Sequence, residues 1–162
     1  MNIEEFNNYL QTIPGQIMEY VPDIVAETAV EYFKETFTKK AFDGNPWVQG
    51  RPKRRGSLLV QSGNLMNSIQ PAEISPERVV ISAGNPQVQY AQAHNEGVDK
   101  TVQVKERYKI KGGGKTLKGK NFSVIKAHKR KINIPKRQFM GDSAELNDII
   151  KEKIDNLINN ML

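Results

Sequence analysis

Apolar residues recur at helical spacing near both ends of the chain. This spacing predicts a helix over residues 2–13, a longer helix over residues 23–41 and a last helix that begins at Asp142. The apolar positions behind these predictions are Ile3, Phe6, Leu10 and Ile13 in the first helix, Ile24, Ala29, Phe33 and Phe37 in the second, and Leu146, Ile149, Ile150, Ile154, Leu157, Ile158 and Met161 in the last. Each helix should therefore bury one face against a shared core.

The ends and outer faces of these helices carry signals of their own. Pro22 suits a first helical turn. We expect the cap of the last helix at Asp142 or Ser143, and Asp142 followed by Glu145 three positions later is typical of a capping box. Glu35 and Lys39 are four positions apart, a spacing that favours an ion pair on the surface of the second helix. The acidic outer face of that helix consists of Glu27, Glu31 and Glu35.

The middle of the chain alternates apolar and polar residues, which is typical of half-exposed strands. A strand that enters at Leu65 and runs to about Ile74 should return over residues 79–83, after a turn with proline at its second position. Further strands are predicted over residues 101–108, 122–125 and 132–134, with the basic residues 129–131 as a break before the last. This order predicts an α+β fold, in which an antiparallel β-sheet packs against the long N-terminal helix and the C-terminal helix.

Two short stretches frame the most basic part of the chain. Tyr90 and His94 are four positions apart, so a short helix would place them on one face, and Gly97 would supply the left-handed residue that ends it. The second stretch leads from Ile134 to Phe139, and we expect both residues to be buried where the chain enters the last helix. Both stretches should contribute to the core or to an interface.

The 162 residues suggest a single domain, 1–162, which is long enough to bury a core. Its charge is uneven, because residues 98–131 hold twelve Lys and Arg against Asp99 and Glu106, a net charge of +10. The rest of the chain, with twelve basic and sixteen acidic residues, carries −4. We therefore interpret residues 98–131 as a basic strand–loop–strand arm, rather than as part of a basic face that covers the whole domain.

Three interpretations of this arm remain open. It could be a solvated arm, a loop that becomes ordered against a neighbouring protein subunit, or a nucleic-acid contact. The lysines that would act in assembly, or would contact nucleic acid in the alternative, are Lys109, Lys111, Lys115, Lys118 and Lys120. Because the glycines among them make ordering costly, we expect residues 109–120 to become ordered only between subunits.

The sequence does not assemble the residue types that catalysis requires. The chain has no cysteine, which excludes thiolate metal sites and a cysteine nucleophile. Residues 112–116, Gly-Gly-Gly-Lys-Thr, lack the first glycine of a phosphate-binding loop, and the residues that follow predict no helix. His94 fits a core or interface histidine better than a base, and Trp47 fits an anchor for its loop better than a partner-binding hot spot. We therefore expect a protein that is not an enzyme and that uses no cofactor and no metal.

Four motifs, taken in order, resemble those of the phage virion morphogenesis proteins, the Mu-type tail completion proteins, which are similar to tail terminators. The motifs are Gly44-Asn45-Pro46-Trp47, Leu58-Leu59-Val60-Gln61-Ser62-Gly63-Asn64-Leu65, Tyr90-Ala91 with His94 and Gly97, and Ile134-Pro135-Lys136-Arg137-Gln138-Phe139-Met140-Gly141. The resemblance implies a structural protein of the tail or the head–tail junction. It also implies an α+β fold and ring assembly, often as a hexamer.

The same resemblance implies partners and a location. The protein would associate with itself in a ring-like homo-oligomer, with six subunits as one candidate size, and with other phage neck or tail proteins, while nucleic acid is a secondary candidate. We expect no membrane partner, because residues 1–20 predict no signal peptide and no stretch reaches the roughly 18 apolar residues of a membrane helix. The expected location is the host bacterial cytoplasm during assembly and then the virion.

Overall fold

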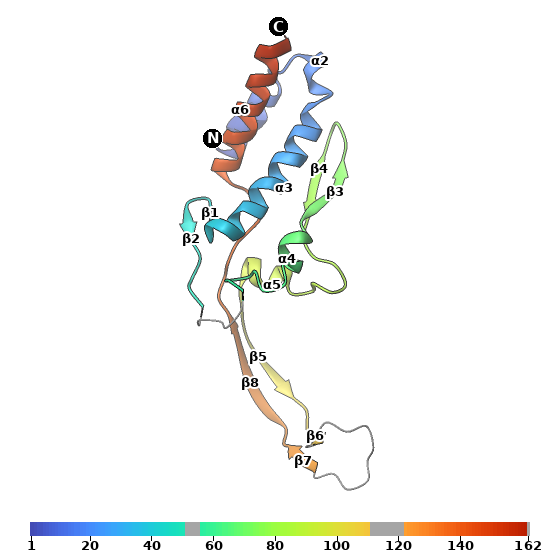
Figure 1. Ribbon diagram of the computed structural model, residues 1–162, viewed down its shortest axis with the longest axis vertical. Coiled ribbons are helices and arrows are strands. Elements are labelled where there is room, and N and C mark those ends of the chain that lie inside the picture. Colours follow the sequence, from blue (N-terminus) through green and yellow to red (C-terminus); the bar gives the residue numbers. More distant parts are fainter. Residues whose placement is uncertain (51–55, 111–121, 162) are drawn as a thin grey trace.

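The computed structural model describes residues 1–50, 56–110 and 122–161, which form an elongated molecule of mixed helix and strand (Figure 1). Its helices are α1 (Ile3–Leu10), α2 (Gly15–Met18), α3 (Val21–Lys39), α4 (Asn64–Asn67), α5 (Ala91–Glu96) and α6 (Ala144–Met161). Its strands are β1 (Ala41–Phe42), β2 (Asn45–Pro46), β3 (Gln70–Ile74), β4 (Val79–Ser82), β5 (Val98–Val104), β6 (Arg107–Ile110), β7 (Phe122–Ile125) and β8 (His128–Ile134). The predicted α+β class is confirmed.

The three predicted long helices are present and pack together at one end of the molecule (Figure 1). Pro22 lies in the first turn of α3, as expected, and the predicted ion pair between Glu35 and Lys39 forms at 3.3 Å. The helix ends where Lys40 adopts the left-handed conformation, with φ of 57°, and donates its N–H to the carbonyl oxygen of Thr36 at 2.8 Å. The chain then reverses through β1 and β2.

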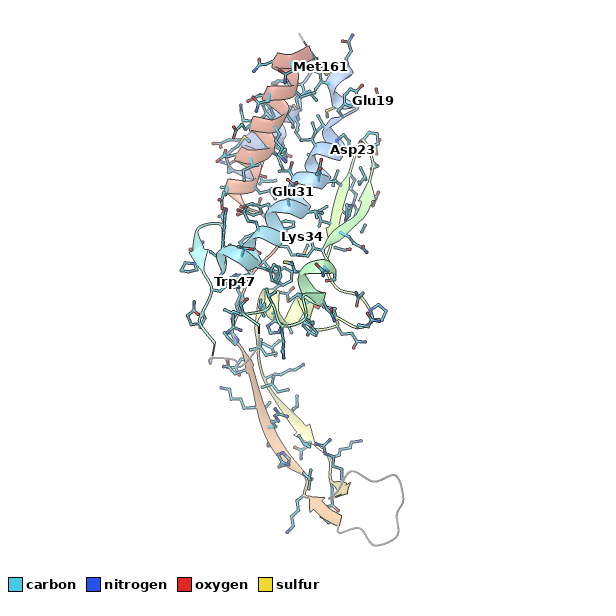
Figure 2. All side chains as sticks on the ribbon, in the orientation of Figure 1. Glu19, Asp23, Glu31, Lys34, Trp47 and Met161 are labelled. Carbon is cyan, nitrogen blue, oxygen red and sulfur yellow. The ribbon has the colours of Figure 1, made fainter. Side chains whose placement is uncertain are left out.

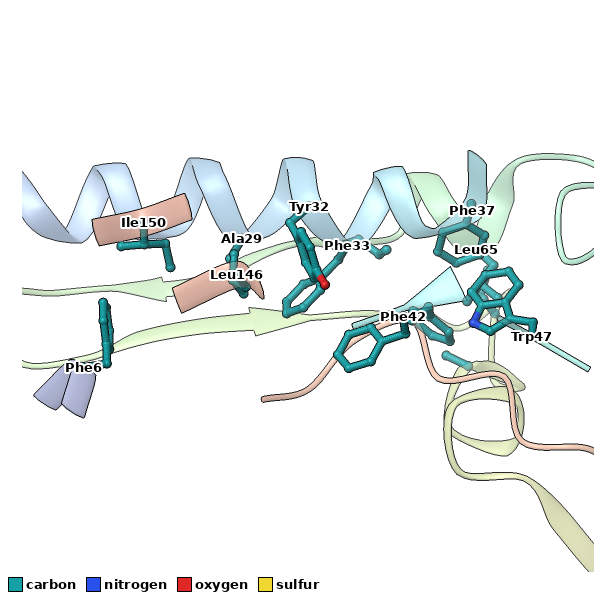
Figure 3. Close-up of a cluster of buried hydrophobic side chains, with 14 of the residues drawn as sticks. Phe6, Ala29, Tyr32, Phe33, Phe37, Phe42, Trp47, Leu65, Leu146 and Ile150 are labelled. Carbon is teal, nitrogen blue, oxygen red and sulfur yellow. The ribbon is translucent and has the colours of Figure 1, made fainter. Parts of the chain in front are cut away.

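A row of aromatic side chains forms the centre of the core (Figure 3). The ring of Phe37 meets Trp47 edge-on, with centroids 5.4 Å apart, and lies 5.2 Å from the ring of Phe139. Such pairs contribute about 0.5–1.5 kcal/mol beyond the area they bury. Phe139 is completely buried, which confirms that prediction.

The strands form four separate two-stranded antiparallel sheets in the described residues, rather than the one sheet that the sequence predicts. The hairpin of β3 and β4 follows the expected turn, in which the N–H of Ser75 donates to the carbonyl oxygen of Arg78 at 2.8 Å. Every side chain of β3 is exposed, and Pro71 within it has no N–H to donate. β3 is therefore an exposed edge strand, and within this hairpin only β4 is partly buried.

The prediction of a strand that enters at Leu65 is wrong, because residues 64–67 form the short helix α4. Gly63 precedes it with φ of 76°, and Leu65 and Ile69, four positions apart, are both almost fully buried. The hydroxyl of Ser68 donates to the carbonyl oxygen of Leu65 at 2.7 Å and accepts the N–H of Gly84 at 2.9 Å. Helical spacing of the two apolar residues thus overrides the apparent alternation, and the strand begins only at Gln70.

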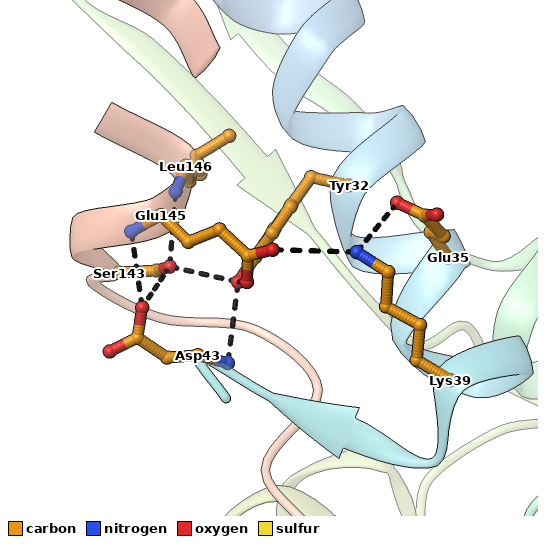
Figure 4. Close-up of polar contacts among 7 residues, drawn as sticks. All are labelled: Tyr32, Glu35, Lys39, Asp43, Ser143, Glu145 and Leu146. Carbon is orange, nitrogen blue, oxygen red and sulfur yellow. Dashed lines mark hydrogen bonds and ion pairs between the residues drawn. The ribbon is translucent and has the colours of Figure 1, made fainter. Parts of the chain in front are cut away.

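Ser143, one of the two candidates, caps the N-terminus of α6, and the capping box of Asp142 does not form (Figure 4). The hydroxyl of Ser143, not the carboxylate of Asp142, accepts the N–H of Leu146 at 3.2 Å. A second acceptor comes from the β1–β2 turn, where Asp43 Oδ1 accepts the Ser143 hydroxyl at 2.7 Å and the N–H of Glu145 at 3.2 Å. A residue far away in sequence therefore completes the cap, which local sequence spacing could not reveal.

The described part of the basic segment forms an antiparallel ribbon that projects from the body (Figure 1). β5 pairs with β8 from Val98 opposite Ile134 to Val104 opposite His128, and β6 then pairs with β7. Residues 129–131 belong to β8, so the predicted break at these residues is wrong: their cross-strand partners keep them in register. Of the assembly lysines, Lys109 lies in β6, whereas Lys111, Lys115, Lys118 and Lys120 fall outside the described residues, as does the whole of the Gly-Gly-Gly-Lys-Thr stretch, 112–116.

Candidate interaction site

The segment from Ile134 to Gly141 passes between α5 and the loop that carries Trp47, and we call the packed contacts along it the junction. Trp47 lies on the loop side, where its ring N–H donates to the carbonyl oxygen of Gln138 at 2.6 Å. Its backbone N–H donates to the carbonyl oxygen of Lys40 at 2.7 Å, and only 5% of the residue is exposed. Trp47 thus anchors its loop to the core, as the sequence suggests, and Figure 2 places it beside the end of α3.

The short helix α5 forms the other side of the junction. The side-chain oxygen of Asn95 accepts the backbone N–H of Phe139 at 2.9 Å and that of Met140 at 3.1 Å. The N–H of Arg137 donates to the carbonyl oxygen of His94 at 2.8 Å. Asn95 thus satisfies two partly buried backbone donors, a role that the sequence alone did not indicate. The signal in the sequence was an asparagine at the end of a short helix, because its side-chain amide is free to bond backbone groups of another segment.

Gly97 ends α5 with φ of 80°, which confirms the predicted positive φ. Space is restricted as well, because a Cβ atom at this position would lie 2.9 Å from the backbone nitrogen of Lys136 and 3.2 Å from the carbonyl oxygen of Ile134. These neighbours are backbone atoms, so no change of side-chain rotamer could make room for a larger residue at position 97. Gly97 therefore allows the base of the ribbon to lie close to the junction.

Tyr90, the N-cap residue of α5, and His94 within the helix lie side by side, with their rings edge-on and their centroids 5.8 Å apart. Tyr90 is 42% exposed, so it does not belong to the core. Ile134 is only half-buried, which corrects the expectation that it is buried like Phe139. The reason is position: Ile134 is the last residue of β8, at the point where the ribbon leaves the body.

Tyr90 and His94 face an open cleft of about 670 Å³ beside the junction. Residues from three of the four sequence motifs line it: Leu58, Leu59 and Leu65 from the second, Tyr90 and His94 from the third, and Arg137 from the fourth. Motifs separated by up to eighty positions therefore converge on one surface feature. This convergence makes the cleft and the junction beneath it the candidate site.

Arg137 connects the junction to the cleft. The residue is 7% exposed, and its Nε donates to the carbonyl oxygen of Val48 at 2.9 Å. In the described part of the chain no carboxylate forms an ion pair with it, and no Asp or Glu is among the residues that line the cleft. A buried guanidinium beside apolar walls suits the binding of an anionic group.

Residues 1–50, 56–110 and 122–161 contain no group of three or more His, Asp or Glu side chains placed to hold a metal ion. None of the helices among them is long and apolar enough to cross a membrane.

The fold and the site together define a small α+β protein with an open cleft beside a projecting basic ribbon. The family model of the phage virion morphogenesis family matches residues 16–159, and the chain belongs to that family. All four sequence motifs lie within the matched range, so the resemblance they carry is confirmed. Membership indicates a structural role in phage virion morphogenesis and association with the virion. No curated protein and no solved structure matches the chain.

Proposed function

We propose that this protein completes the phage tail or joins it to the head, and that it acts as a ring-like homo-oligomer. Beyond family membership, the observation that supports this proposal is the projecting ribbon of β5 to β8 (Figure 1). An isolated two-stranded ribbon is at best marginally stable in water. A neighbouring subunit would cover it and give it stability.

One face of the ribbon carries the apolar residues that a partner would cover. Val98, Val102, Val104, Ile132 and Ile134 lie on it and are only half-buried. Two exposed basic residues lie on the same face, Lys100 opposite Ile132 and Arg130 opposite Val102, whereas Lys129 lies on the reverse face opposite Gln103. The ribbon thus offers apolar residues interspersed with positive charge, which an acidic partner surface would complement.

The helical body of another subunit offers such a surface. Acidic residues line the outer side of α3, along which Figure 2 labels Asp23 and Glu31. Glu31 is paired with Lys153 of α6 at 3.1 Å, so part of this face is already neutralised within the subunit. Exposed pairs of this kind are worth about 0–1 kcal/mol, and a neighbouring ribbon could compete with them. A contact between the ribbon of one copy and the α3 face of the next is head-to-tail, and repetition can close a ring.

Truncation of the ribbon tests the proposal. Asp99 and Asn133 face each other across β5 and β8, so replacement of residues 100–132 by Asn-Gly would join them through a two-residue turn and remove most of the proposed contact. We expect this variant to fold but to fail to complement a phage that lacks the gene, with free heads and unfinished tails in electron micrographs. Normal virions from the truncated protein would refute a role for the ribbon in assembly.

A second variant separates the contribution of the ribbon's charge from that of its length. The full-length ribbon with Lys100 and Arg130 replaced by Gln keeps the strands but loses the positive charge of the apolar face. Intermediate complementation is expected if both the apolar residues and the charge contribute. Complementation as efficient as that of the wild type would assign the contact to the apolar residues alone.

A second candidate function is nucleic-acid binding by the same ribbon. The specific observation is its shape, because a two-stranded basic ribbon fits the major groove of duplex DNA. Phosphate contacts would make the affinity fall steeply with salt. A gel-shift titration of the wild type against the truncated variant, at low and at moderate salt, tests this function. Equal binding by the two proteins, or none, would exclude it.

A further inference from the structure

The cleft beside α5 has the composition of a carboxylate-binding site. Among the described residues, Arg137 is the only Lys or Arg that lines the cleft, and only 7% of it is exposed. The two internal segments outside the described residues, 51–55 and 111–121, contain no Asp or Glu that could pair with it. A buried guanidinium with a single carbonyl contact retains donors for a carboxylate, which it can bind through two parallel hydrogen bonds.

The walls of the cleft indicate which chemical group should lie next to the carboxylate in a bound ligand. Leu58, Leu59 and Leu65 are apolar, and the ring of Tyr90 is exposed beside them. An apolar side chain adjacent to a carboxylate would therefore fit better than a phosphate, which gains nothing from such walls. A volume of about 670 Å³ also suits an extended loop tip better than a helix, whose diameter with side chains is about 10–12 Å.

The β3–β4 hairpin of the same chain presents this combination. At its end Ile74 is 46% exposed, and Glu73 and Glu77 beside it are exposed. The contact from Glu73 to Arg78 is 3.7 Å long and lies at the surface, so it holds the carboxylate only weakly. We propose that the tip of this hairpin, Glu73 to Glu77, docks into the cleft of a second copy of the chain.

The positions of the two features support a contact between copies. Figure 1 places the tip of the β3–β4 hairpin near α2, whereas α4 and α5 lie at the other end of α3, next to the ribbon. Tip and cleft are therefore different surfaces at different ends of one molecule. A contact between them is head-to-tail and runs in the same direction as the ribbon contact proposed above. This inference rests on the proposed homo-oligomer and names a second surface that holds it together.

Cysteine cross-linking tests the contact directly, because the chain has no cysteine of its own. Ile74→Cys places one thiol at the hairpin tip, and Gln61→Cys places one at the exposed edge of the cleft. After the two purified variants are mixed and oxidised, we expect disulfide-linked heterodimers on a non-reducing gel. Either variant alone should give few dimers, because a disulfide would then have to join two hairpin tips or two clefts. Asn8→Cys, at an exposed position of α1, is the matched control partner for Ile74→Cys.

The charges at the tip give an independent readout. Glu73→Gln combined with Glu77→Gln should weaken self-association in sedimentation equilibrium by at least about tenfold, because the Arg137 guanidinium would remain buried without a carboxylate. Glu4→Gln, which removes an exposed charge on α1, should leave self-association unchanged.

The outcomes separate this inference from the proposed function. If the protein forms oligomers, but the 74–61 cross-link is no stronger than the 74–8 control, the docking site is refuted while the ring proposal stands. Absence of any oligomer, both in the purified protein and in assembled particles, would overturn both. A strong 74–61 cross-link together with the charge effect would support the docking site.

Discussion

At the scale of single residues, the junction depends on a few positions that each perform two tasks. Phe139 fills the core against Phe37, and its backbone N–H is held by Asn95. Gly97 ends α5 and lets the base of the ribbon approach. Loss of such a residue disturbs the core and the candidate site together.

Phe139→Ala should lower the free energy of unfolding by about 3–5 kcal/mol, because it leaves a cavity in the aromatic row. Chemical denaturation followed by circular dichroism measures this change. Val124→Ala is the control, since Val124 is 50% exposed on the ribbon and should cost almost nothing. An unfolding midpoint unaffected by Phe139→Ala would mean that the aromatic row is not the centre of the core.

Gly97→Ala should destabilise the protein by roughly 1–3 kcal/mol, because φ of 80° strains an L-residue and the new Cβ atom would meet the backbone of Lys136. Thermal melting measures the effect. Gly15→Ala is a matched control in α2, where nothing lies within 4 Å of the added Cβ atom and φ is not positive. Its melting temperature should stay the same or rise slightly. Equal effects of the two substitutions would argue against the close approach at Gly97.

At the scale of elements, α6 is held to the body by a polar network at its N-terminus (Figure 4). Burial raises the pKa of Tyr32, whose hydroxyl therefore stays protonated and donates to Glu145 at 2.9 Å. The Ser143 hydroxyl, together with the backbone N–H of Glu145, lowers the pKa of the Asp43 carboxyl below its usual value. The network joins α3, the β1–β2 turn and α6 at one point.

Asp43→Asn should destabilise the protein by roughly 1 kcal/mol at neutral pH, because the capping charge at the helix N-terminus is lost. Asn also tolerates the left-handed backbone at this position, where φ is 48°, so the substitution tests charge rather than strain. Because the folded-state pKa of Asp43 is lowered, its stabilisation is present above the unfolded value of 3.8 and is lost as the pH falls through the folded value.

The difference between Asp43→Asn and the wild type should therefore shrink below about pH 4, which urea unfolding at several pH values would show. Asp142→Asn is the control, since Asp142 is exposed and does not cap α6 in this structure. If Asp142→Asn lowered the stability more than Asp43→Asn, the result would instead support the capping box of Asp142 and Glu145 that the sequence predicts.

At the scale of the whole molecule, the helical body and the projecting ribbon have separate tasks. The aromatic core lies in the body, and the strands of the ribbon pair only with one another. We therefore expect the truncation of residues 100–132 to leave the melting temperature nearly unchanged while assembly is lost. Differential scanning calorimetry measures the first effect, with Phe139→Ala as the destabilised reference. A truncated protein that unfolds would show that the ribbon supports the body.

The sequence by itself determined the elements whose signals are local. Helical periodicity predicted α1, α3 and α6, proline and glycine positions predicted the turns, and Trp47, Gly97 and Phe139 were identified by residue type and position. Four ordered motifs sufficed to indicate the family. These features could be predicted because each depends on residues a few positions apart.

Only the tertiary structure decided how distant segments satisfy one another. Asn95 and Phe139 are 44 positions apart, and Asp43 caps a helix 102 positions further along the chain. Arg137 reaches the loop after Trp47, and so creates the cleft that the motifs line. The same applies to α4, where burial of Leu65 and Ile69 overrides a local pattern. No local spacing encodes these contacts, because a buried polar group accepts whichever partner the packed chain brings within hydrogen-bond distance.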